Sequence, residues 1–332
     1  MLQQTTRRRA LAVVAALSLP LGLGACELGS DLAGVHDAPA EVTDGAAMTP
    51  SAAQKVTSRV LESAQAALGE TGSGAAKARA EVLTGPAKTQ AAAAVKTNST
   101  PASAPDVTRP AEPEVLAVSE GAQWPRAILA TTRDGDVQRL HLLVAEDSKS
   151  AFSLFTTVDM ASGASVPSLG APEDGAGAHL GEKANNDALA AANTWAKAVA
   201  YPKPKKTPDS VSVNDGFSRA LRANADEAAK EVGKLGKLTR STTIDGKQAA
   251  SFDLADGGRI LFVSATRTDT VTATKDTKKL SLSGDAAKIA NKKSASKKIV
   301  WTYVETVAMV VPETGKARIV GAAENLQKVV AT

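Results

Sequence analysis

The order of hydrophobic periods along the chain most limits the folds open to it. Between residues 49 and 95 apolar residues recur at helical spacing, after the helix-starting pair Thr49-Pro50. From 115 to 160 they alternate at period two, around the turn signal Asp134-Gly135. The same order returns between 184 and 332. Helices grouped before antiparallel strands are typical of α+β folds, because a parallel α/β fold would alternate strand and helix.

We therefore expect two units, each with helices followed by an antiparallel sheet. The first α+β unit covers 49–160, and the second covers 184–332. Residues 161–183, rich in Gly, Pro and Ser, are expected to link them. Residues 26–48 have no hydrophobic period and are expected to form a flexible tether. The tail to Val330 is expected to be a short helix or extended.

Residues 1–25 have the three parts of a secretory signal peptide. A basic start (Arg7-Arg8-Arg9) precedes an apolar run from Ala10 to Leu19 and a small-residue stretch. The apolar run is too short to span a bilayer as a helix. The paired arginines also resemble a twin-arginine export signal, so both the general secretory route and the twin-arginine route remain open.

The sequence Leu23-Gly24-Ala25-Cys26 resembles the lipobox of bacterial lipoproteins. The resemblance implies that Cys26 carries a diacylglyceryl thioether and becomes the first residue of the mature chain. Two or three acyl chains anchor a protein stably to a membrane. We therefore expect a lipid-anchored protein on the extracytoplasmic face of the cell membrane; the alternative is that Cys26 is a free thiol.

Composition excludes several other functions. The charge of +4 falls to +1 when Arg7, Arg8 and Arg9 leave with the signal peptide, so nucleic acid is not an expected partner. A single cysteine excludes a disulfide framework. We expect no metal and no cofactor, because the chain has three histidines, no Gly-x-Ser-x-Gly elbow and no phosphate-binding loop.

Four short motifs resemble those of an uncharacterised family of actinobacterial secreted lipoproteins, a domain of unknown function. They are Gln123-Trp124-Pro125-Arg126, Gly257-Gly258, Ala265-Thr266-Arg267-Thr268 and the strand from Trp301 through Glu305 to Pro312. The resemblance implies lipid anchoring and extracellular exposure, and it brings no activity and no site residues. The helix-then-sheet order is also similar to NTF2-like or cystatin-like units.

The strand from Lys298 to Val311 carries the best candidate ligand site. Alternation places Trp301, Tyr303, Glu305, Val307 and Met309 on one face. Apolar walls with one carboxylate suit a small-molecule pocket, in which Glu305 would bind a cationic or hydroxyl-bearing group. In the alternative, which we favour, the strand face that carries Trp301 and Tyr303 is a half-covered outer face of the sheet, and Glu305 lies in water.

Other residues fit weaker hypotheses. Trp124 and Arg126 could clamp an anionic ligand, although such a tryptophan more often closes a core. Arg267 is expected on a solvated strand face, and His141 on the strand face opposite its leucine neighbours. Eight lysines between Lys275 and Lys298 could contact anionic headgroups or wall polymers, but we favour a solvated loop.

Three functions follow from these observations. The first is a non-enzymatic binding or adaptor module for an envelope protein or wall polymer. The second is a small-molecule or lipid carrier whose pocket is lined by Trp301, Tyr303, Glu305 and Met309. The third is an enzyme of the NTF2-like cyclase or isomerase type, with Glu305 or His141 as base; we expect the chain not to be an enzyme because few acids and bases converge.

Overall fold

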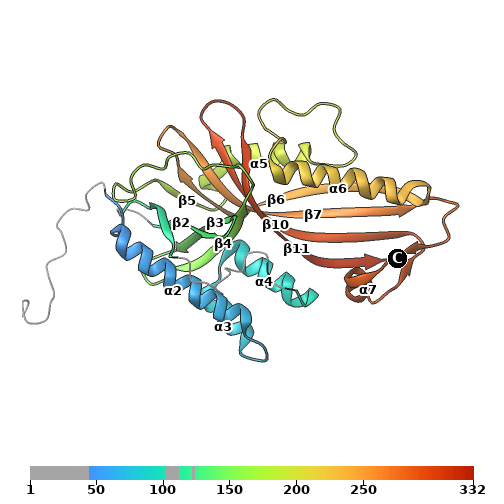
Figure 1. The fold of residues 1–332 in the computed structure, drawn as a ribbon, viewed down its shortest axis with the longest axis horizontal. Helices are drawn as coiled ribbons and strands as arrows, with labels where there is room; N and C mark the ends of the chain where they lie inside the picture. The colour runs from blue at the N-terminus through green and yellow to red at the C-terminus, as the bar shows by residue number, and fades with distance from the viewer. Residues whose placement is uncertain (1–44, 100, 102–111, 122–123) are drawn as a thin grey trace, which may run out of the picture. The chain divides into compact units, whose positions relative to one another are not determined.

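The computed structural model describes residues 45–332 except 100, 102–111 and 122–123 (Figure 1). The expected signal peptide, Cys26 and most of the tether lie outside the described residues. Residues 46–48 of the expected tether instead join the folded part, where the Ala47 N–H donates to the Ser119 carbonyl at 2.8 Å. Among the described residues, no helix is both long enough and apolar enough to cross a membrane.

The first helical segment forms as its sequence predicts. It contains α2 (Pro50–Gly69), α3 (Ala75–Val82) and α4 (Gly85–Thr97). The Thr49 hydroxyl caps α2 by accepting the Ala52 N–H at 3.3 Å. Helix α2 packs its buried stripe, which includes Leu61, against the leucines of the following strands.

Nine strands form one antiparallel sheet in the order β1-β2-β3-β4-β11-β10-β7-β6-β5. Their bounds are β1 Glu114–Val118, β2 Arg126–Asp134, β3 Val137–Ala145, β4 Ser153–Met160, β5 Ala178–Leu180, β6 Gly236–Asp253, β7 Gly258–Ala273, β10 Lys298–Pro312 and β11 Arg318–Ala331. A separate pair joins β8 (Leu280–Ser281) to β9 (Ser294–Ala295). The described chain is thus mixed α+β with a large antiparallel sheet.

The arrangement differs from two separate units, because strands of both expected units share this sheet. The final strand β11 lies between β4 and β10, and Gly321 and Ala322 pair with Met160 and Asp159. The chain from Thr43 onward is one compact unit. The tail is extended, as one of the two alternatives predicted. Pairing across the halves removes two open sheet edges, which would otherwise expose unpaired backbone groups.

The expected linker at 161–183 also belongs to this unit. Leu169 and Ala176 are buried in the core that β2–β4 share with β6, β7 and β10. That shared core means that the sheet curls so that parts of its two halves face one another, and Figure 1 shows the strands bending at the middle of the sheet. A polar, glycine-rich composition therefore did not prevent this segment from packing.

Helices cover the two faces of the sheet differently. Helices α5 (Asn186–Ala198) and α6 (Gly216–Val232) lie on one face of β6, and α4 contacts the opposite face of β10 and β11. Short 3-10 turns precede α5 (Lys183–Asn185) and follow α6 (Gly233–Leu235), and α7 (Gly284–Ala290) lies beside β11. Asp215 caps α6 by accepting the Ser218 N–H at 2.8 Å. The α6 face carries the candidate site.

Candidate functional site

The structure confirms that Trp301, Tyr303 and Glu305 share one face of β10. Register extends this face across the sheet, because Trp301 pairs with Asp269, Tyr303 pairs with Arg267, and Glu305 pairs with Glu324. Val307 and Met309 lie on the same face but pack beneath α5 with the buried Trp195. Met309 is therefore core and is separated from the other candidate ligand-binding residues.

Glu305 is fully buried, so the expectation that it lies in water is wrong. Its Oε1 lies 2.6 Å from Nε of Arg267, while Oε2 has no hydrogen-bond partner. Burial raises the pKa of Glu305 to about 7, against the opposing effect of the Arg267 charge. Glu305 lies behind Arg267 and cannot be the group that meets a ligand first.

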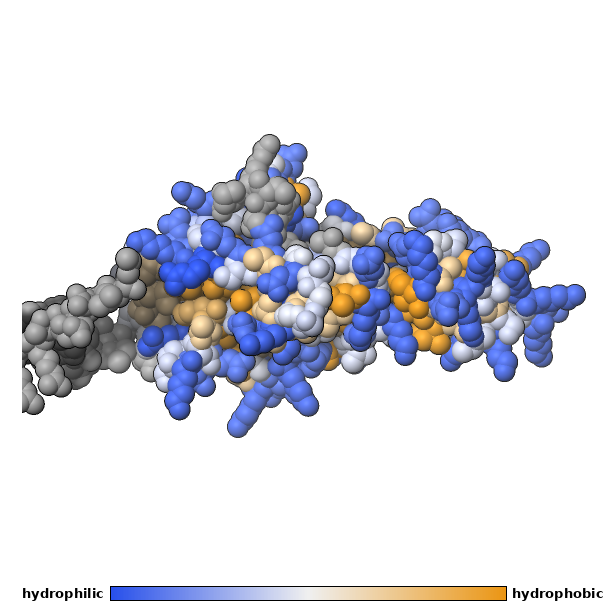
Figure 2. All heavy atoms as spheres, turned by 90° about the horizontal axis from the view of Figure 1, so that it is seen from below, coloured by the Kyte–Doolittle hydropathy of each residue, from blue (hydrophilic) through white to orange (hydrophobic). Residues whose placement is uncertain are grey.

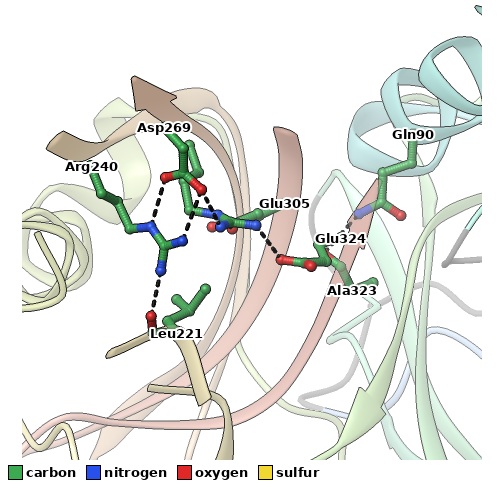
Figure 3. Close-up of polar contacts among 8 residues, drawn as sticks. Gln90, Leu221, Arg240, Asp269, Glu305, Ala323 and Glu324 are labelled. Atoms are coloured by element: carbon green, nitrogen blue, oxygen red, sulfur yellow. Dashed lines mark hydrogen bonds and ion pairs between the residues drawn. The ribbon is translucent and has the colours of Figure 1, made fainter. Parts of the chain in front are cut away.

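Arg267 is also buried, contrary to the expected solvated face. Its Nη1 lies 2.9 Å from Oδ2 of Asp269, and its Nη2 lies 2.8 Å from Oε2 of Glu324 (Figure 3). Burial opposes the charge of Arg267, but Glu305, Glu324 and Asp269 more than offset it and raise its pKa above the ordinary value. Each guanidinium nitrogen of Arg267 has a carboxylate partner.

A second buried arginine completes this ion-pair network. Arg240 on β6 makes a bidentate pair with Asp269, at 2.6 Å from Nε and 2.8 Å from Nη2, and its Nη1 donates to the Leu221 carbonyl of α6 (Figure 3). The network thus ties β6, β7, β10 and β11 to one helix. With all side chains ionised, its two arginines and three carboxylates (Asp269, Glu305 and Glu324) sum to one negative charge.

Sequence reasoning missed Arg240, Asp269 and Glu324 and placed Arg267 on a solvated face, although a signal was present. Positions 263, 265, 267, 269 and 271 of β7 read Val-Ala-Arg-Asp-Val on one strand face. An arginine and an aspartate that replace apolar residues within a core-facing alternation indicate a buried ion pair. The pattern in β7 alone does not identify the remaining ion-pair partners, because these lie on the other strands β6, β10 and β11.

A cavity of about 550 Å³ lies over this face, between the sheet, α6 and residues 279–281. The sheet, which forms its floor, grades from apolar to polar along the strands. Leu238, Val271 and Ile299 form one row across the sheet, Arg240, Asp269 and Trp301 form the next, and Arg267 and Tyr303 the third. The Arg267 guanidinium lies 4.0 Å from the Tyr303 ring centroid, so that ring face is occupied.

Helix α6 forms the roof of the cavity. Asn224, Ala228, Glu231, Val232 and Leu235 line it at helical spacing, the last of them in the 3-10 turn that follows. Asn224 comes one turn after Leu221, whose carbonyl binds Arg240, whereas Leu235 directly precedes β6. The roof therefore carries one polar side chain, Asn224, near the ion pairs and one charged side chain, Glu231, near the apolar row.

Trp124 and Arg126 form a separate feature at the start of β2. The Arg126 guanidinium lies 4.6 Å from the Trp124 ring centroid, and its Nη2 donates to the Gly121 carbonyl at 3.3 Å. Trp124 is 40% exposed, and neither residue lines the cavity. The structure therefore does not bring this pair together with the β10 residues.

His141 is buried in β3, away from the cavity. Its ring nitrogens lie 2.7 Å from the Thr132 hydroxyl and 2.9 Å from the Thr157 hydroxyl. Burial, with the nearby positive charge of Arg139, lowers the pKa of His141 to about 3. A neutral imidazole held by two hydroxyl groups in a core is a structural group rather than an accessible base.

Within the described ranges, no group of three or more His, Cys, Asp or Glu side chains is placed to hold a metal ion. No family model, curated protein or solved structure matches the chain.

Proposed function

We propose that this protein is a lipid-anchored, extracytoplasmic binding protein that holds a small amphipathic molecule in the cavity beneath α6. The observation that carries the proposal is the gradient of the cavity floor on the sheet, from the Leu238, Val271 and Ile299 row to the Arg267 and Glu324 end. A volume of about 550 Å³ falls within the range of small-molecule sites. An apolar chain with a polar head matches this gradient in both chemistry and direction.

The polar end suits a neutral or cationic head that donates hydrogen bonds. Each guanidinium nitrogen of Arg240 and Arg267 already has an acceptor, so an anion would have to displace a carboxylate. Glu324 is 42% exposed at its side chain and lines the cavity. The carboxylate that meets the head is therefore Glu324, with Trp301 beside the ligand, and not Glu305 as the sequence suggested.

Attachment to the membrane through acylated Cys26 remains part of the proposal and rests on the lipobox resemblance. The finer likeness to NTF2-like or cystatin-like units is also part of the proposal. It is supported by helices α5 and α6, which lie across a curved antiparallel sheet. A non-enzymatic role is supported by the positions of Glu305 and His141, since both are buried and held by internal partners.

Native mass spectrometry on the piece Glu27–Thr332, purified gently from its own host, tests the proposal. We expect an extra mass that disappears on denaturation. Ala228→Phe should abolish it, because Ala228 lines the roof and a phenyl ring there projects into the cavity and obstructs it. A clean mass for the wild-type protein, or an unchanged extra mass in the Ala228→Phe protein, would contradict the proposal.

A calorimetric titration tests the chemistry of the head. Octylamine should bind, and octanoate should bind at least tenfold more weakly. Trp301→Ala should weaken octylamine about tenfold through lost contact area. Trp124→Ala is the matched control, because Trp124 is also partly exposed but lies outside the cavity. Equal losses in both variants would place the binding elsewhere.

An adaptor role is the second candidate, and the uncovered face of the same strands favours it. Hydroxyl side chains there lie directly opposite one another, as Thr239–Thr270, Ser241–Thr268 and Thr243–Thr266. Such a hydrogen-bonding surface suits a wall polymer or protein partner. Thr268→Arg should keep the fold but remove a neighbour that crosslinks to the wild-type protein in the envelope; an unchanged crosslinking pattern would reject this candidate.

A further inference from the structure

One end of the sheet carries a strong excess of positive charge. The strands β6 and β10 begin there, and β7 and β11 end there. The two segments at this end, residues 234–237 and 274–298, contain ten lysines and two aspartates. We call these two segments the basic tip. Figure 2 shows long hydrophilic side chains projecting from this end.

The two segments of the basic tip form one surface. The Thr274 hydroxyl donates to the Lys234 carbonyl at 3.1 Å, and the Thr277 hydroxyl donates to the Leu235 carbonyl at 2.7 Å. All ten lysines are exposed, and the single ion pair recorded within the tip joins Lys288 to Asp285. Apart from Lys288, the lysines of the tip are thus presented to solvent without an ion-pair partner among the described residues.

The basic tip also borders the apolar end of the cavity. Leu235, Lys279 and Leu280 line the cavity and belong to the tip. Leu235 is 52% exposed, among the most exposed large apolar side chains of the described residues. Lysines around an exposed leucine suit a bilayer surface, where ammonium groups lie among headgroups and an apolar side chain enters the boundary with the acyl chains.

We propose that the basic tip docks on the anionic surface of a lipid bilayer and turns the apolar end of the cavity toward it. Charge complementarity carries the choice of partner, because each lysine near an anionic surface adds favourable energy that is largely independent of its orientation. Two other classes fit less well. The tip has no aromatic residue, whereas single-stranded nucleic-acid sites interleave aromatics with cations, and protein interfaces are depleted in lysine.

The inference is separate from ligand binding, since docking depends on surface lysines and the ligand site on the cavity. It gives the predicted lipid anchor a second contact with the same membrane. Because the anchor already holds the chain at the membrane, the second contact forms at a high effective concentration.

Sedimentation with vesicles tests the proposal on the unacylated piece Glu27–Thr332, which contains all four cores of the compact unit. We expect binding to vesicles of phosphatidylcholine and phosphatidylglycerol in equal parts, loss of binding at high salt, and no binding to phosphatidylcholine alone. A triple neutralisation should weaken binding roughly a hundredfold, at about fivefold for each lysine. Its members are Lys275→Gln, Lys278→Gln and Lys293→Gln.

Two controls keep the result interpretable. A second triple neutralisation removes lysines outside the tip that are also exposed and should leave binding unchanged; its members are Lys55→Gln, Lys149→Gln and Lys247→Gln. The Lys→Arg form of the tip triple keeps the charge and should retain binding. Equal losses from both neutralisations would overturn the proposal, as would retention on a polyglycerol-phosphate matrix without binding to vesicles. Octylamine titration without vesicles reports the cavity separately, so the two proposals can fail independently.

Discussion

Replacing Glu305 by glutamine should remove a pH dependence from the stability of the fold. Glutamine has almost the same shape, keeps one acceptor for Arg267 and cannot ionise. Arg267 retains Asp269 and Glu324 in the variant, so its charge stays paired. The substitution therefore removes one buried negative charge and leaves the packing of the ion-pair network in place.

The magnitude follows from the raised pKa of Glu305, from 4.5 to about 7 in the fold. The folded protein holds this proton more tightly than the unfolded chain, so unfolding releases it between those two values. The Glu305 contribution to the free energy of unfolding is thus complete below 4.5 and is lost as pH rises through about 7. The total is about 3 kcal/mol, and most of it falls between pH 5 and pH 8.

Urea unfolding of wild type and Glu305→Gln at pH 5 and pH 8, followed by tryptophan fluorescence, measures this directly. The variant should gain about 2–3 kcal/mol relative to wild type between the two pH values. The variant must be compared with wild type, because His141 makes the free energy of unfolding of both proteins rise with pH in part of this range. Glu231→Gln, at an exposed position of the cavity roof, is the control and should show no such gain. A constant difference between Glu305→Gln and wild type would refute the reasoning and show that Arg267 offsets burial completely.

Three further predictions follow from the same physics. The lowered pKa of His141, about 3, means that stability is lost as pH falls below the unfolded value of 6.5, and His141→Gln should flatten that loss in acid unfolding curves. Arg267→Met should cost about 3–5 kcal/mol above pH 7 in urea unfolding, since it strands the buried charge of Glu305, and a second change, Glu305→Leu, should restore most of the loss. Cys26→Ser should move the protein from the membrane fraction to the soluble fraction, and continued sedimentation with membranes would contradict acylation at Cys26.

Local periodicity was enough to predict most of the elements. The helices after Thr49 and the strand from Lys298 onward have strong periods of their own, and both form. The face shared by Trp301, Tyr303 and Glu305 follows from alternation alone. These features depend on residues close in sequence, so the sequence displays them directly.

Pairing between distant strands could not be predicted in the same way. Nothing in Arg318–Ala331 specifies that it inserts between β4 and β10, because its two edges carry the same backbone groups as any other strand. The site depends on that insertion, since Glu324 reaches Arg267 only when β11 lies beside β10. The prediction of a linker at 161–183 was wrong for the same reason, because Leu169 contacts its buried neighbours only in the curled sheet.

The buried ion pairs occupy positions on the sheet face that apolar side chains could also fill. Apolar side chains of similar volume in place of such a network are often at least as stable, and the neighbouring row of Leu238, Val271 and Ile299 shows that this face can be built from them. We infer that the charges instead favour one orientation of β6, β7, β10 and β11 beneath α6, because a shift of any of these strands would leave a buried charge unpaired. Packing alone would tolerate such shifts, and the cavity beside the network would change shape with them. By this reasoning, we infer that the ion pairs help to fix the shape of the cavity beside them.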